Sequence, residues 1–244
     1  MAFSVLTVCT ANICRSATAE RALRTSFARN GLGEVVEVSS AGVAARPGAP
    51  MCSDAAALLA ESRLAAGPAA SGSDAGHVSR RLSGAALRQA DLVLTADRGH
   101  LGAAGALAPQ SRSRLFTIRQ AAALLDWVIG GSGVLEVARL RASGVDPELD
   151  PLGPLVDVPA LPPEATARLD WLMAELDAAR GTAPLPAPAS RLAPRADRQA
   201  IALPWESDDV GDPHELGFEY HPDSVRLIVD AADSIGRAFA VVLA

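Results

Sequence analysis

The chain has 244 residues, a formal net charge of −6 and no lysine, so every strongly basic residue is arginine. This length allows a substantial core, the acidic balance argues against a nucleic-acid partner, and the lack of lysine excludes P-loop NTPases and Schiff-base enzymes. Three cysteines are too few for a disulfide framework, and no apolar stretch is long enough to span a membrane. We therefore expect a cytoplasmic protein with no membrane partner. The excess of Ala, Arg, Gly and Pro is typical of a GC-rich genome, and we expect a bacterial source.

The N-terminal segment predicts a strand, a loop and a helix in direct succession. Residues 3–8 are apolar and predict a buried strand, and residues 17–30 show helical periodicity that ends at Gly31. Between them lies the string Val8-Cys9-Thr10-Ala11-Asn12-Ile13-Cys14-Arg15-Ser16. Backbone N–H groups at a helix N-terminus carry partial positive charge, so this loop is a candidate anion cradle.

Two side chains of this loop carry chemistry. The positive field of the helix N-terminus favours the thiolate of Cys9, which is the nucleophilic form of cysteine. The planar guanidinium of Arg15 suits two oxygens of a phosphate or arsenate. One loop would thus supply a nucleophile, an oxyanion cradle and a charge clamp.

Apolar runs alternate with helical periodicity along the rest of the chain, which is the pattern of an α/β sheet. Further strands are expected at residues 35–39, 92–95 and 115–117. Helices are expected at residues 54–66, 83–89 and 118–129 and from about 222 to 243, with Ser53 and Asp97 as helix caps. Right-handed crossovers would place the Cys9 loop at the carboxyl edge of the sheet, where such sheets bind ligands.

Residues from about 130 to 204 interrupt this pattern. A short helix is expected at residues 134–142, and residues 163–179 predict an amphipathic helix. Residues 182–204 are rich in Pro, Ala and Arg and predict a linker. We interpret residues 1–244 as a single domain with this helical and Pro-rich insertion, which would cover a site, bind a partner or only extend the fold.

The loop string resembles the active-site loop of the low-molecular-weight protein tyrosine phosphatase family, written Cys-x-Gly-Asn-x-Cys-Arg-Ser-Pro. Ala11 stands for the glycine and Ala17 for the proline. If position 11 needs a positive φ, its Cβ costs about 1–2 kcal/mol. The resemblance extends to further segments: Ser40-Ala41-Gly42, His77 to Leu82, Asp91 to Asp97 and Asp212-Pro213. It covers about residues 3–129 and 206–244.

The resemblance implies a four-stranded parallel sheet flanked by helices, with a flavodoxin-like fold, and a phosphatase activity without a cofactor or metal. Cys9 would form a phosphocysteine, while Arg15 and the loop would hold the phosphoryl oxygens. Asp212 would act as the general acid, with Asp208 and Asp209 as competitors for that role. The implied substrate is a phosphotyrosine protein or a small aryl phosphate.

The remaining loop residues would bind phosphate or support the loop. The phosphate-binding segment comprises Thr10, Ala11, Asn12, Ile13, Cys14 and Ser16. In the family, the hydroxyl at the position of Ser16 donates to the thiolate. Asn12, Ser40 and His77 match a family hydrogen-bond network that holds the loop in shape.

Two other function classes stay open on the sequence. A thioredoxin-coupled arsenate reductase uses the same loop, but it passes oxidation to further cysteines, and only Cys52 lies outside the loop here. A non-catalytic phosphate- or phosphopeptide-binding module is the other alternative, and Ala11 is the residue that favours it.

Overall fold

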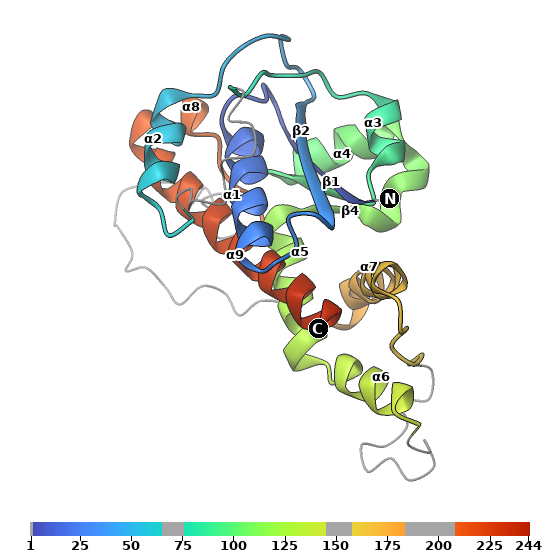
Figure 1. Ribbon diagram of the computed structural model, residues 1–244. Coiled ribbons are helices and arrows are strands. Elements are labelled where there is room, and N and C mark those ends of the chain that lie inside the picture. Colours follow the sequence, from blue (N-terminus) through green and yellow to red (C-terminus); the bar gives the residue numbers. More distant parts are fainter. Residues whose placement is uncertain (1, 65–75, 145–157, 184–207) are drawn as a thin grey trace, which may run out of the picture.

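The computed structural model describes residues 2–64, 76–144, 158–183 and 208–244 of the chain. Its centre is an all-parallel, four-stranded sheet in the order β2-β1-β3-β4 (Figure 1). The strands are β1 (Phe3–Cys9), β2 (Val36–Gly42), β3 (Leu92–Thr95) and β4 (Leu115–Thr117). The predicted fold class is thereby confirmed, and the last two strands have the predicted bounds.

Helices cover both faces of the sheet. The longer helices are α1 (Arg15–Arg29), α2 (Ser53–Glu61), α4 (Arg98–Leu107), α5 (Ile118–Asp126), α6 (Val134–Ala142), α7 (Ala165–Thr182) and α9 (His221–Leu243). Shorter helical turns are α3 (Gly84–Gln89), η2 (Pro109–Arg114), η3 (Trp127–Gly131), α8 (Pro213–Leu216) and η6 (Phe218–Tyr220). Every expected helix is present: α6 has the predicted bounds, and the others have shifted ends.

Three of these differences have a local cause. The helix expected at 54–66 ends at Glu61, where Ser62 adopts an extended backbone and its Oγ bonds the carbonyl of Leu59 (2.7 Å). The residue at the N-cap position of this helix is Cys52 and not Ser53, because Cys52 has a non-helical backbone (φ −56°, ψ 127°) and Ser53 is already the first helical residue. The Cys52 N–H donates to the carbonyl of Ile13 (2.6 Å). The helix expected at 118–129 changes to a π-turn after Asp126.

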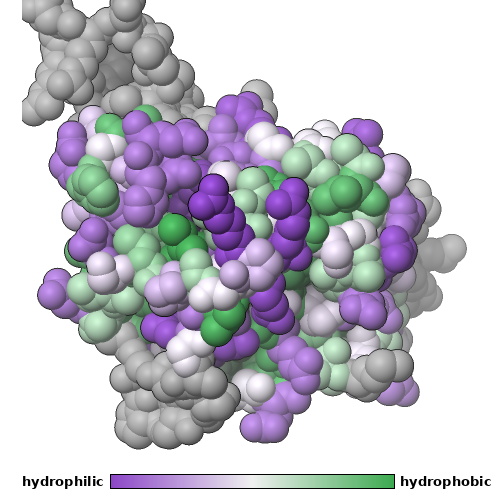
Figure 2. Space-filling model, turned by 90° about the horizontal axis from the view of Figure 1, so that it is seen from above, coloured by the Kyte–Doolittle hydropathy of each residue, from purple (hydrophilic) through white to green (hydrophobic). Residues whose placement is uncertain are grey.

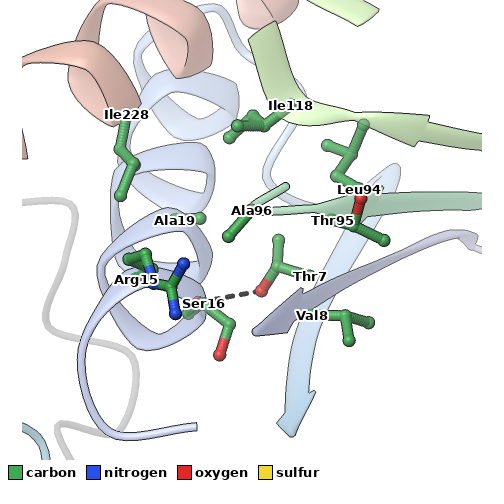
Figure 3. Close-up of a pocket in the computed structure, with 10 residues that line it drawn as sticks. All are labelled: Thr7, Val8, Arg15, Ser16, Ala19, Leu94, Thr95, Ala96, Ile118 and Ile228. Atoms are coloured by element: carbon green, nitrogen blue, oxygen red, sulfur yellow. Dashed lines mark hydrogen bonds between the residues drawn. The ribbon is translucent and has the colours of Figure 1, made fainter. Parts of the chain in front are cut away.

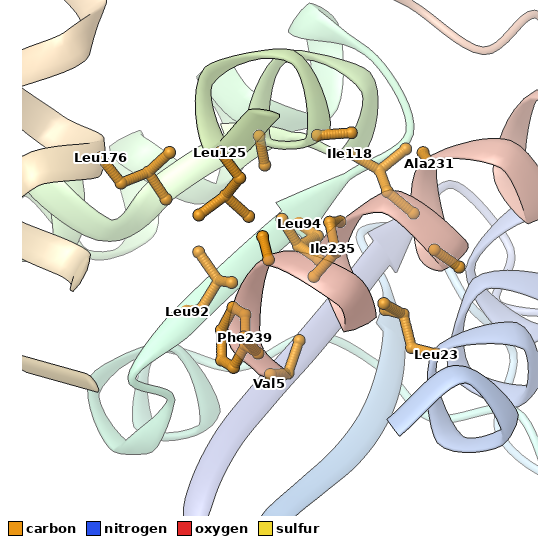
Figure 4. Packing of buried hydrophobic residues seen from close by; sticks show 14 of the residues in the cluster. Val5, Leu23, Leu92, Leu94, Ile118, Leu125, Leu176, Ala231, Ile235 and Phe239 are labelled. Carbon is orange, nitrogen blue, oxygen red and sulfur yellow. The ribbon is translucent and has the colours of Figure 1, made fainter. Parts of the chain in front are cut away.

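The core has two layers that follow from strand geometry. Neighbouring residues of a strand point to opposite faces, so a strand covered on both faces is apolar throughout. Val5 belongs to the larger cluster, which packs beneath α1, α5 and α9, whereas Leu6 belongs to the smaller cluster beneath α3 and α4. Figure 4 shows the larger cluster, where Ile235 and Phe239 of α9 lie over the sheet.

The described part of the insertion packs away from the strand carboxyl ends. The loops that follow the strands lie at the top of Figure 1, and α6 and α7 lie at the other end of the molecule. Arg180 of α7 lies 3.6 Å from the ring centroid of Phe116 and donates to the carbonyl of Leu115 (2.8 Å), the first residue of β4. The linker predicted at 182–204 lies almost wholly outside the described residues.

No single helix in the described part of the chain is long and apolar enough to cross a membrane. A bent pair, Ile118–Gly131 with Val134–Ala142, passes the same test only when its two helices are taken together. Much of α5, the first helix of that pair, is buried in the larger core cluster.

Candidate active site

The loop between β1 and α1 surrounds a buried thiol. Cys9 ends β1, and its side chain is only 2% exposed. Its Sγ lies 3.0 Å from the hydroxyl oxygen of Ser16 and accepts a hydrogen bond from the Asn12 N–H (3.3 Å). The sulfur atom is thus surrounded by a hydroxyl, a backbone N–H and the N-terminus of α1.

Asn12 gives the loop its turn. Its φ is +56°, and no other non-glycine residue in the described ranges has a positive φ. Asparagine tolerates this left-handed conformation better than most residues do. Ala11 therefore keeps an ordinary backbone, and the strain that a Cβ would cause at a positive φ does not arise.

The side chain of Asn12 is the centre of a buried network. Its Nδ2 donates to Ser40 Oγ (2.7 Å) and Ser16 Oγ (3.0 Å), and its Oδ1 accepts from the Arg80 N–H (2.8 Å). His77 Nε2 lies 2.6 Å from the Asn12 carbonyl oxygen. The structure thus brings together Asn12, Ser16, Ser40 and His77, which the sequence analysis had selected.

Glu20 belongs to this network and was missed by the sequence analysis. Its carboxylate accepts a hydrogen bond from Ser40, and His77 Nδ1 lies 3.7 Å from it. Burial alone would raise the pKa of Glu20, but the hydrogen bonds from His77 and Ser40 and the charge of Arg24 lower it below its usual value. Its spacing, one helical turn after Ser16, is the signal that would have identified it.

Gly42 permits the close approach of β2 to the loop. A Cβ on Gly42 would lie 2.5 Å from the Thr10 carbonyl oxygen and 2.8 Å from the Asn12 nitrogen, so a side chain there would displace the loop. The Ser40-Ala41-Gly42 segment therefore contributes both a hydrogen bond and space to the loop.

Arg15 is buried and holds several oxygen atoms. Its Nη1 donates to Asp97 Oδ2 (3.0 Å) and to the Val210 carbonyl (3.1 Å). Its Nη2 donates to Asp212 Oδ2 (2.5 Å) and to Thr10 Oγ1 (3.3 Å). The guanidinium therefore joins the loop to two segments that are distant in sequence.

Asp97 caps α4 as predicted and also orients Arg15, which was not predicted. Its Oδ1 accepts from the His100 N–H (2.9 Å) and lies 2.8 Å from His100 Nδ1. Burial raises the pKa of Asp97, but the hydrogen bonds from His100 and the charges of His100 and Arg15 outweigh it and lower the pKa to about 2. Asp97 is thus an ionised partner of Arg15 at neutral pH.

Of the acidic residues proposed as the acid, Asp212 is the one bonded to Arg15. It caps α8 through the His214 N–H (3.0 Å), and Pro213 occupies the first position of that helix. Asp209 instead accepts hydrogen bonds from the backbone (2.9 Å) and guanidinium of Arg98. Asp212 is therefore the carboxylate that the fold brings to the loop.

A small cavity lies behind the loop and not over the thiol. Its lining includes Thr7, Ser16, Leu94, Ile118 and Ile228, and Cys9 is absent from that lining (Figure 3). The view from above in Figure 2 shows strongly hydrophilic residues over this end of the molecule, with hydrophobic side chains between them. The cavity is a packing gap between the sheet and helices α1 and α9.

Comparison with known proteins agrees with this geometry. The family model for low molecular weight phosphotyrosine protein phosphatases matches residues 4–125, half of the chain. The low molecular weight protein-tyrosine-phosphatase Wzb of Escherichia coli is 33% identical over 112 residues, which are 46% of this chain and 67% of that protein. The fold and the loop thus agree with the family model. The chain belongs to the low molecular weight phosphotyrosine protein phosphatase family.

Other similar proteins have a broader coverage. The protein-arginine-phosphatase of Bacillus subtilis is 29% identical over 154 residues, 63% of this chain and 83% of that protein. A low molecular weight phosphotyrosine phosphatase structure from Vibrio cholerae matches with a TM-score of 0.53 at 16% identity, covering 96% of this chain and 94% of that chain. This structure supports the fold alone. The chain spans about two thirds of the length of the Wzb relatives.

Proposed function

We propose that this protein hydrolyses phosphotyrosine or aryl phosphate monoesters through a phosphocysteine intermediate. The observation that carries the proposal is the meeting of Cys9, Arg15 and Asp212 at one loop. Cys9 lies in contact with Ser16 and Asn12, and Arg15 binds Asp212 directly. The family relationship supports the same reaction class.

The reaction would take place in two steps. The Cys9 thiolate attacks phosphorus, and the P–O bond to the aryl group breaks while Asp212 gives its proton to the leaving oxygen. Water then attacks phosphorus in the phosphocysteine, and Asp212 takes a proton from that water. The S–P bond breaks, inorganic phosphate is released, and Cys9 returns to its thiolate form. Arg15 and the loop N–H groups stabilise the charge on the equatorial oxygens in both steps.

The contact between Arg15 and Asp212 suggests how substrate would assemble the site. In the structure, Arg15 Nη2 donates to Asp212 Oδ2, 2.5 Å away. The same guanidinium N–H group suits a phosphoryl oxygen. A bound phosphoryl group would replace the carboxylate at this donor. Asp212 would then lie beside the ester oxygen that it has to protonate.

Initial rates on p-nitrophenyl phosphate and on a phosphotyrosine peptide test the proposal. Cys9→Ser should abolish turnover but keep vanadate binding, because Arg15 and the cradle remain. Arg15→Lys should weaken both binding and rate, since the bidentate guanidinium is lost. Turnover by Cys9→Ser comparable to wild type would contradict a covalent mechanism.

The same assay separates the alternatives, which the comparisons do not favour. An arsenate reductase would consume a thiol reductant with arsenate, and a binding module would bind vanadate without turnover. A phosphoarginine peptide serves as a third substrate. If the protein hydrolysed its P–N bond in preference to the aryl ester, the substrate class would be phosphoarginine and not phosphotyrosine.

We also propose a cytoplasmic location and a single-domain organisation. The three cysteines are free, and two of them are buried, which suits a reducing compartment. In the described residues, α7 packs against α5 and α9 of the sheet domain, which supports an insertion and not a separate domain.

A further inference from the structure

Four metal-ligating side chains meet next to the active-site loop. Cys14 ends the loop, Cys52 caps α2, His214 lies in α8 and His221 begins α9. Their Sγ and ring nitrogen atoms all lie within 4.8 Å of one another. Figure 1 shows α2 and α8 side by side at one end of α9. Segments distant in sequence thus converge on one point.

The donor set and the spacing match a tetrahedral metal ion. Two thiolates and two imidazoles form a standard ligand set of structural Zn²⁺, with bonds of about 2.0–2.3 Å that hold the ligand atoms roughly 3.3–3.8 Å apart. Cys52 Sγ and His221 Nε2 are 3.5 Å apart, within that range. The widest separation in the cluster, 4.8 Å at most, would have to shorten by up to about 1.0–1.5 Å to complete the site.

His221 has the orientation of a ligand. Its Nδ1 lies 3.0 Å from the Phe218 carbonyl oxygen, which only accepts, so the geometry favours a proton on Nδ1 and turns Nε2 toward Cys52. Such a carbonyl partner is the usual support of a metal-binding histidine. The ring is 2% exposed and stacks on Phe218, with an interplanar angle of 7°. The His214 ring packs edge-on against it at 5.0 Å.

The thiols are held in place by the backbone. The Cys14 carbonyl accepts from the N–H and the hydroxyl of Thr18, and the Cys52 N–H donates to the Ile13 carbonyl. Both cysteines are therefore fixed in position at the start of a helix, Cys14 before α1 and Cys52 before α2.

We propose that Cys14, Cys52, His214 and His221 bind one Zn²⁺ ion in a tetrahedral site. Binding would release one proton from each thiol and would use the neutral form of each imidazole. The ion would join the catalytic loop, through Cys14, to the Asp212 segment, through His214. The metal site itself does not depend on the proposed phosphatase activity.

Cobalt binding by the full-length, reduced and chelator-treated protein tests the site. We expect one Co²⁺ per chain, with the intense visible absorption of tetrahedral cobalt and a thiolate charge-transfer band, both removed by added Zn²⁺. Cys52→Ser and His214→Gln should each weaken binding by more than about 10-fold. Loss of a residue that only hydrogen-bonds to a metal ligand already costs about 10–100-fold in affinity, and loss of the ligand itself should cost at least as much. His214 is exposed, so its variant should fold even if Cys52→Ser does not.

Cys9→Ser is the matched thiol control, and it should keep the cobalt spectrum because Cys9 is not in the cluster. Added Zn²⁺ should raise the Tm of wild type and of Cys9→Ser more than that of His214→Gln at the same Zn²⁺ concentration. Three results would overturn the proposal: no cobalt spectrum, a spectrum lost in Cys9→Ser but kept in His214→Gln, or a six-coordinate spectrum without a thiolate band.

Discussion

At the residue scale, Arg15 connects the loop to the C-terminal part of the chain. A buried arginine needs charged or polar partners, and here Asp97, Asp212, Thr10 and the Val210 carbonyl supply them. Two carboxylates more than neutralise one guanidinium, so a phosphate dianion has to displace one of them. Asp212 is the better candidate, because Asp97 is also held by His100.

Removal of the Asp212 carboxyl group should give a leaving-group-dependent defect. With an aryl phosphate whose leaving group is poor, Asp212→Asn should lower kcat by about 10²–10⁴, the usual range for loss of a general acid. With p-nitrophenyl phosphate the loss should be smaller, because that phenolate needs less protonation. Steady-state rates on a series of aryl phosphates measure this slope.

Asp209→Asn is the matched control, since Asp209 is bound to Arg98 and should leave kcat and its leaving-group dependence near wild type. A large, leaving-group-dependent loss in Asp209→Asn, with Asp212→Asn near wild type, would transfer the role of the acid to Asp209.

Cys14 should protect Cys9 from irreversible oxidation in the metal-free enzyme. Peroxide converts the Cys9 thiolate to a sulfenic acid, and the Cys14 thiol then forms a disulfide with it and releases water. A dithiol should therefore restore the activity of wild type after peroxide, whereas Cys14→Ser should stay inactive. Residual activity on p-nitrophenyl phosphate before and after the dithiol measures this difference. Equal recovery of both proteins would remove the resolving role of Cys14.

At the scale of elements, the β1–loop–α1 unit could be predicted from the sequence. The residues that hold the loop from other segments could be predicted only in part. The strand, the loop string and the helix are local in sequence, and the resemblance pointed to Asn12, Ser40 and His77. Glu20 was missed although its spacing, one helical turn after Ser16, was a usable signal. The second role of Asp97 was missed because its partner Arg15 is distant in sequence. The start of α2 after Cys52 was missed likewise, since Cys52 bonds to Ile13 of the loop before α1.

Ser40 tests how strongly β2 supports the loop. Ser40→Ala removes an acceptor from Asn12 and a donor to Glu20, both of them buried, so the free energy of unfolding should fall by about 1–3 kcal/mol. Asn12 would also lose one of the contacts that fix the loop, and kcat should fall with it. Urea denaturation and initial rates measure the two effects.

Ser39→Ala is the neighbouring control, because the Ser39 hydroxyl makes only a long hydrogen bond (3.5 Å) to Val5, outside the loop network. If Ser39→Ala lowered the stability and kcat as much as Ser40→Ala, the effect would belong to β2 in general and not to the Asn12 network.

At the scale of the whole molecule, the described parts of the insertion extend the core and stand away from the active-site loop. Helix α7 contributes Leu169, Leu172 and Leu176 to the larger cluster, which α9 shares. Helix α9 also carries His221 at its first turn, so the insertion and the active-site end are connected through one long helix. Periodicity predicted the helices at 134–142 and 163–179. It could not predict where they lie relative to the sheet, because that depends on contacts with β4 and α9.

Leu172 of α7 tests whether the insertion acts on stability or on the site. Its side chain is fully buried, so Leu172→Ala should lower the free energy of unfolding by about 2–5 kcal/mol, through lost burial and a cavity. At temperatures where the variant stays folded, kcat and KM on p-nitrophenyl phosphate should equal those of wild type, because α7 lies at the other end of the molecule from Cys9. Leu140→Ala on α6 is the matched control: Leu140 is 37% exposed, and its loss should cost about 0.5 kcal/mol or less. An unchanged stability of Leu172→Ala together with a changed KM would instead assign the insertion to the active site.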